Sequence, residues 1–245
     1  MNMLRPARIL AWCAVVLILG HVAGLIAREG FDVYETKYGL IRQFDLNAEG
    51  NLAAWFSSFL LICSAALCLL VAQVRRLRQE AIAGRWAILS AFLLVMAIDE
   101  TAQLHDMASR PLRNGLGLDF GVLYFAWLIP ALLIVGGAAF YFAPVVRNLS
   151  DAIRPQLIVA VVVYLAGAVG FEMVGGSVVD EGRQSLTYLA VMTLEESLEI
   201  LGGFLFLTAL LNQVRELRPA LVLRWTGELP ELTLAEDRAA SPTEF

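Results

Sequence analysis

Three glutamates stand close together in a stretch that is otherwise largely apolar, Leu194–Gly203 (LEESLEILGG). At 100° per residue of α-helix, Glu195, Glu199 and Glu196 fall at about 0°, 40° and 100°, on one face of the helix. Carboxylate oxygens bind hard divalent cations, and in suitable surroundings they exchange protons. The stretch therefore predicts a helix with an acidic face that holds a cation or a proton.

A second polar stretch, Ala97–Asp106 (AIDETAQLHD), combines three acids with one of the two histidines of the chain. On a straight helix Asp99 and His105 would lie about 120° apart. Glu100 and His105 are five residues apart, so on a straight helix they would not lie on one face and could not bind the same metal ion well. Either the helix loosens near Gln103, or these side chains serve different partners.

Both stretches belong to segments long enough to cross a membrane. The chain of 245 residues is 59% hydrophobic and only 17% charged, whereas soluble domains carry about 25% charged residues. A helix needs about 20 apolar residues to cross the ~30 Å hydrocarbon core of a bilayer. Six such segments are predicted, at residues 9–27, 52–74, 86–107, 120–146, 156–175 and 186–214. The predicted fold class is therefore all-α, a polytopic membrane bundle of six transmembrane helices.

The basic residues predict the orientation of this bundle. With the N-terminus inside, twelve of the 18 Lys and Arg residues fall in cytoplasmic segments and six in outer segments. The positive-inside rule favours this arrangement, so both termini are expected in the cytoplasm. Residues 215–245 are polar and contain three prolines. We expect them to form a flexible cytoplasmic tail after the transmembrane domain of residues 1–214.

The acids of different predicted helices should lie at similar depths. At 1.5 Å per residue, Glu172, Asp99 and Glu195 come out at roughly 5, 10 and 13 Å below the outer surface, and Glu199 at roughly 19 Å. His21 ends the first predicted helix at a comparable level. Polar side chains from several helices are therefore expected to meet in the outer half of the bundle.

Burying several acids in a membrane costs free energy, and this cost limits the states in which the cluster can exist. One charged side chain at the centre of a bilayer costs roughly 2.5–3.5 kcal/mol, and neighbouring carboxylates also repel one another. The cluster persists if its acids are protonated, hydrogen-bonded, paired with Arg110 or Arg113, or neutralised by a cation. A structural network of carboxyl and histidine side chains is one interpretation. A functional proton or cation site is the default for ionisable residues inside a membrane.

Asp, Glu and His side chains suit Mg, Mn, Ca, Fe or Zn. The Glu-x-x-His pairs of di-iron carboxylate bundles do not occur in the sequence, and two histidines exclude a multi-histidine membrane oxygenase. The basic residues are scattered and the net charge is −5, which excludes a nucleic-acid surface. The predicted ligands of a divalent metal ion are Asp99, Glu100, His105, Asp106, Glu172, Glu195, Glu196 and Glu199.

Three stretches, Phe44–Leu60, Ala97–Asp106 and Leu194–Gly203, resemble those of uncharacterised bacterial multi-pass membrane proteins with an Asp-Glu-x4-His-acidic motif. The resemblance implies no function. It implies that the acids and the histidine of these motifs belong to one site, and that the protein lies in a bacterial inner membrane. Asp106 stands where the motif is expected to have Glu.

Three hypotheses for the function follow. The first is a membrane protein that binds a divalent cation, for example a metal-dependent enzyme acting on a lipid or a small periplasmic molecule. The second is a proton- or cation-coupled transporter in which Glu195 and Glu199 titrate, although the cytoplasmic halves of the helices look too dry for access from both sides. The third is a structural or assembly subunit. The lipid bilayer is the one partner that the sequence predicts, and the identity of the metal and of the substrate stays open.

Overall fold

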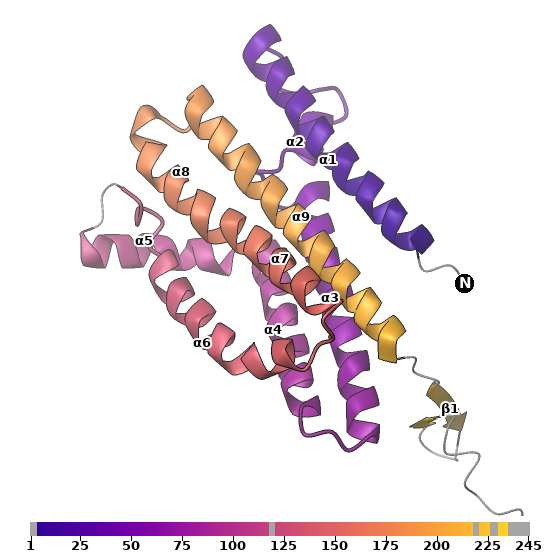
Figure 1. Ribbon diagram of the computed structural model, residues 1–245. Coiled ribbons are helices and arrows are strands. Elements are labelled where there is room, and N and C mark those ends of the chain that lie inside the picture. The colour runs from indigo at the N-terminus through magenta and orange to yellow at the C-terminus, as the bar shows by residue number, and fades with distance from the viewer. Residues whose placement is uncertain (1–3, 118–120, 218–220, 226–229, 235–245) are drawn as a thin grey trace, which may run out of the picture.

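Long apolar helices dominate the computed structural model, which describes residues 4–117, 121–217, 221–225 and 230–234 (Figure 1). Within these residues, five helices are long and apolar enough to cross a membrane, or six if α4 and the helix after it form one bent span. The long helices are α1 (Leu4–Phe31), α3 (Leu52–Leu77), α4 (Ala83–Ala102), α6 (Leu128–Arg147), α7 (Arg154–Leu165) with α8 (Glu172–Val178), and α9 (Leu186–Leu217). The shorter ones are α2 (Leu40–Phe44), α5 (Leu104–Leu116) and the 3-10 turn η2 (Val179–Glu181).

Four of the six predicted spans lie within α1, α3, the run from α7 to α8, and α9. The other two have different boundaries. The third was expected to run to residue 107, but α4 ends at Ala102, because Gln103 adopts a left-handed backbone conformation. The fourth was expected from residue 120, but α6 begins at Leu128. Pro130 lies in the first turn of α6, where its missing N–H is not needed.

The outer faces of the long helices carry large apolar side chains that are exposed among the described residues. On α6, for example, Leu133 is 76% exposed and Phe140 is 86% exposed. In water, extended apolar faces of this kind would drive association. In a bilayer they face the lipid chains, so the exposed surface agrees with the hydropathy in describing a multi-pass membrane protein.

The main apolar core lies at one end of the bundle, where α3, α4 and α9 pack together. Trp86, Val71 and Leu210 are fully buried there. We call this the basic end, because α3, α6 and α9 finish there in last turns that contain arginines. The opposite end, at which α4 finishes and α9 begins, is the acidic end. α9 contacts α1, α3, α7 and α8, so it is the central helix of the bundle (Figure 1).

The described part of the tail is not helical. Strands β1 (Leu221–Trp225) and β2 (Pro230–Leu234) pair in antiparallel register, with Leu221 opposite Leu234. We had expected an irregular segment here, and the proline at the start of β2 is tolerated because the first residue of a strand need not donate to the ladder. Residues 218–220, 226–229 and 235–245 of the predicted tail lie outside the described residues.

Candidate functional site

The site begins at a sharp turn between α4 and α5. Gln103 has φ 51° and ψ 43°, a left-handed conformation that ends α4, and its N–H donates to the Asp99 carbonyl at 2.7 Å. The segment Met107–Leu116 is bent by 84° from α4, so that α5 lies crosswise to the long helices (Figure 1). The turn places the first residues of α5 back against the last turn of α4. A break of the helix near Gln103 was one of the two alternatives that the spacing of Glu100 and His105 left open.

This turn builds an aspartate–histidine pair. The two carboxylate oxygens of Asp99 accept from the backbone N–H of His105 and from its Nδ1, each at 2.9 Å. Because a carboxylate only accepts, Nδ1 carries a hydrogen, and in the neutral ring Nε2 is then the basic nitrogen. Both side chains are about one third exposed. The pair therefore combines a fixed ring orientation with access to small molecules.

A buried carboxyl pair lies on the other side of Trp127, in the turns before α6. The rings of His105 and Trp127 have centroids 4.7 Å apart, and Trp127 Nε1 donates to Glu172 Oε1 at 2.9 Å. Glu172 is in turn hydrogen-bonded to Glu195. Both glutamates are buried, and Glu195 Oε2 has no partner among the described residues. Two carboxyl groups can share a hydrogen bond only if one of them is protonated, so we predict that this pair shares a proton.

Two features of the backbone bring these glutamates together. Glu172 directly follows η1 (Ala166–Phe171), a π-helical turn between α7 and α8, and such turns are frequent at functional sites. Glycines then let α9 approach this run closely. A Cβ on Gly167 would lie 2.7 Å from the Glu195 carbonyl oxygen, and a Cβ on Gly202 would lie 2.5 Å from the backbone nitrogen of Tyr164. This is close packing through small residues, which is common between membrane helices.

A second group of acids lies deeper between α3, α4 and α9. The charges of Glu100, Glu196, Glu199 and Glu49 act on one another. Ser57 is hydrogen-bonded to Glu100. Ser57, Glu100, Glu199 and Tyr164 are among the residues that line a cavity of about 10 Å³, which is close to the smallest space that holds one water molecule. We call this cavity the acidic niche.

The predicted site residues thus divide into two groups that meet at the acidic end. Asp99, His105, Glu172 and Glu195 form a chain through Trp127. Glu100 and Glu199 line the acidic niche, and Glu196 interacts with both of them through its charge. The backbone of Asp106 lies in the first turn of α5, but its side chain lies outside what the structure describes. Within the described residues, no three His, Cys, Asp or Glu side chains are arranged to hold a metal ion.

Sequence reasoning missed several contributors. Trp127 lay inside a predicted apolar span and gave no signal of its own. Glu49 lies in the loop between the first two predicted spans and was not among the predicted site residues. Ser57 and Tyr164 matter only because helix packing brings them to the acids, which no local pattern reveals.

His21 takes part at this end of the bundle, though not in the chain of acids. It is buried, its Nδ1 accepts from the Leu46 N–H at 3.1 Å, and its Nε2 contacts Thr193 Oγ1 at 3.0 Å. Since Thr193 already donates to the Leu189 carbonyl, Nε2 is the donor, and His21 ties α1 to α9 and to the loop before α3.

The fold and the site define a class: a multi-pass helical membrane protein with buried carboxyl groups and an aspartate–histidine pair at one end. Residues 5–214 match the model of a domain of unknown function, DUF8692, and the chain belongs to this family. The predicted membership of an uncharacterised family is confirmed to that extent. The matched residues include the whole acidic site. No curated protein and no solved structure matches the chain.

Proposed function

We propose that this protein is a membrane-embedded acid–base protein, in which His105 exchanges a proton with a small molecule or lipid at the acidic end of the bundle. The observation that carries the proposal is the Asp99–His105 pair. Asp99 binds the backbone and the ring of His105 together, which fixes the direction of the ring. A histidine held in this way is the arrangement in which an imidazole works as a general base and then as a general acid.

Each side chain has a defined part in this proposal. His105 Nε2 takes a proton from the bound molecule, and the carboxylate of Asp99 stabilises the imidazolium that results. Trp127 covers one side of the ring and holds Glu172 by its indole N–H. The Glu172–Glu195 pair supplies a second group that holds a proton, within the same layer of the bundle.

The packing favours access from the acidic end alone. The interior between the site and the basic end is lined by apolar side chains such as Trp86, Leu89 and Val71, which offer no polar path to a proton or an ion. Alternating access requires the site to open toward both surfaces in turn. The proposal therefore favours an enzyme over the proton-coupled transporter that we also considered.

A divalent cation in the acidic niche is the second candidate. It is favoured by the four acids Glu49, Glu100, Glu196 and Glu199, whose mutual repulsion a cation would relieve, and by the hydroxyl of Ser57 beside Glu100. Because the niche is no larger than one water molecule, the ion would bind without its waters, and its oxygen ligands would come from Glu100, Glu199 and Ser57. Purified protein would then contain about one equivalent of metal, which Glu199→Gln would remove. Metal-free protein of unchanged stability would contradict this candidate.

The acid–base proposal is tested by comparing cells that produce the wild-type protein, the His105→Gln variant or neither. Untargeted analysis of their lipids and small molecules should find a compound that changes only with the wild-type protein. Asp99→Asn should reduce this change by about 10²-fold or more, the usual contribution of general acid–base catalysis. Equal profiles for wild type and His105→Gln would contradict the proposal, and proton flux into liposomes carrying the wild-type protein would favour the transporter instead.

A further inference from the structure

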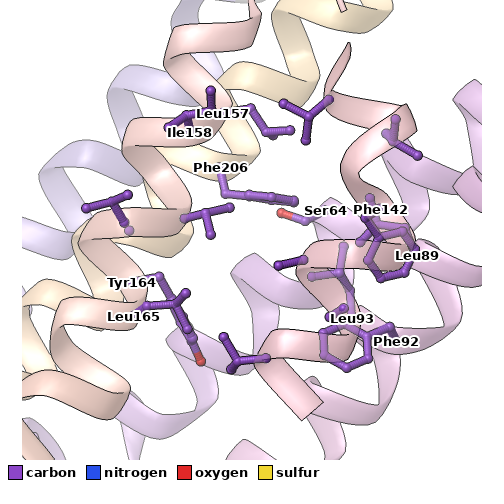
Figure 2. A pocket seen from close by; sticks show the side chains of 18 of the residues that line it. Ser64, Leu89, Phe92, Leu93, Phe142, Leu157, Ile158, Tyr164, Leu165 and Phe206 are labelled. Carbon is purple, nitrogen blue, oxygen red and sulfur yellow. The ribbon is translucent and has the colours of Figure 1, made fainter. Parts of the chain in front are cut away.

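A large apolar cavity opens between α4, α6, α7 and α9 on the basic side of the acidic niche. Its volume is about 490 Å³, which is within the range of ligand-binding pockets. Nearly all of its lining is apolar, and Figure 2 shows Phe206 pointing into the space, with Leu157 and Ile158 near one end and Tyr164 at the other. The shape and the apolar lining of this cavity suit a hydrocarbon chain.

The cavity is open to the surrounding bilayer. Ile158, Val161 and Val162 line it from α7, and each is more than one third exposed at the surface of the protein. A lipid chain can therefore enter sideways without crossing water. The lining residues with polar side chains are Ser64, Tyr164 and Arg147.

The length and the charge of the cavity identify the kind of lipid. Its lining on α6 runs from Val135 to Arg147, about 18 Å at 1.5 Å per residue. Half of the ~30 Å hydrocarbon core, the depth of one leaflet, is about 15 Å. Arg147 lies at the basic end and is exposed, and its guanidinium donates to no residue that the structure describes. An arginine at this depth attracts anionic lipid headgroups.

We propose that this cavity binds one acyl chain of an anionic diacyl phospholipid from the leaflet at the basic end, with its phosphate at Arg147. The far end of the chain then approaches Tyr164 and Gly203, which also line the acidic niche. The site is separate from the acid–base pair and does not depend on it. It gives the protein a lipid as a bound constituent of its fold.

Native mass spectrometry of the protein, released from bilayers of phosphatidylglycerol and phosphatidylcholine, tests the proposal. The wild-type protein should retain one phospholipid, with phosphatidylglycerol preferred about fivefold, the factor expected from one arginine near the surface. Ala138→Trp, which fills the cavity, should lose the lipid. Leu133→Trp on the lipid-facing side of α6 should retain it, since Leu133 does not line the cavity.

A second pair of variants tests the headgroup without altering the packing. Arg147→Gln should abolish the preference for phosphatidylglycerol, while Arg76→Gln, at an exposed position of the same end, should leave it unchanged. His105→Gln should retain the lipid, which separates this site from the proposed acid–base function. The proposal is overturned if wild type retains no phospholipid, if Ala138→Trp retains it equally, or if the preference survives Arg147→Gln. A stable dimer that Ala138→Trp abolishes would assign the cavity to a second copy of the chain and overturn it too.

Discussion

At the scale of single residues, the acidic end joins two proton-binding groups of different kinds. Asp99 and His105 are partly exposed, so that they can meet a ligand. Glu172 and Glu195 are buried and hydrogen-bonded to each other. Trp127 lies between the two groups, with its ring against His105 and its indole N–H on Glu172. Trp127 is thus in contact with both proton-binding groups.

The carboxyl pair predicts an infrared signal. Because Glu172 and Glu195 share a hydrogen bond, membranes containing the wild-type protein at neutral pH should show the stretching band of a protonated carboxyl group. Glu195→Gln should remove this band, since an amide has no such group. Glu216→Gln, at an exposed position on the same helix, serves as the control and should leave the band unchanged. A band that is absent from the wild-type protein would show that the two glutamates are ionised and apart.

The identity of the acids could be predicted from sequence, but their partners could not. Helical periodicity placed Glu195, Glu196 and Glu199 on one face, and the structure brings them to the neighbouring acids Glu172 and Glu100. The predicted metal ligands stay a hypothesis. Helical periodicity did not predict the contact of Asp99 with His105. The contact depends on the left-handed backbone of Gln103, and glutamine is not a residue type that commonly signals this conformation.

At the scale of helices, two interruptions shape the site: the turn at Gln103 and the π-helical turn η1. Both lie inside segments that the sequence predicted as continuous spans. Hydropathy detects apolar length and is insensitive to the local hydrogen-bond pattern, so it located the spans but not their breaks. Each break is followed within two residues by a site residue, His105 and Glu172 respectively.

The close crossing of α7 and α9 gives a prediction for stability. Gly202→Ala would place a Cβ 2.5 Å from the backbone of Tyr164, so the helices must move apart. We expect a loss of about 1–3 kcal/mol in the free energy of unfolding, as for other overpacked sites, measured as a lower melting temperature in detergent. Gly137→Ala is the matched control, because no atom lies within 4 Å of its added Cβ. It should be neutral or stabilising, as alanine favours helix more than glycine does. Equal melting temperatures for the two variants would contradict the close crossing.

At the scale of the whole molecule, the charges predict how the bundle sits in the membrane. The basic end carries most of the arginines, so we expect it to face the cytoplasm. Reporter fusions after Arg78 and Arg147 should then be active in the cytoplasm, and fusions after Arg113 and Arg183 outside it. A reversed pattern would place the acid–base site on the cytoplasmic side and change the class of molecules that can reach it.

The central claim, a histidine oriented for proton exchange, is tested most directly by NMR of protein labelled with ¹⁵N-histidine. The chain has only two histidines, so the spectrum should contain two imidazole rings that differ in tautomer. His105 should carry its hydrogen on Nδ1, toward Asp99, and His21 on Nε2, toward Thr193. Asp99→Asn should alter the signals of His105 and leave those of His21 unchanged. If His105 instead carries its hydrogen on Nε2, or does not respond to Asp99→Asn, the pair does not exist and the proposed acid–base function is wrong.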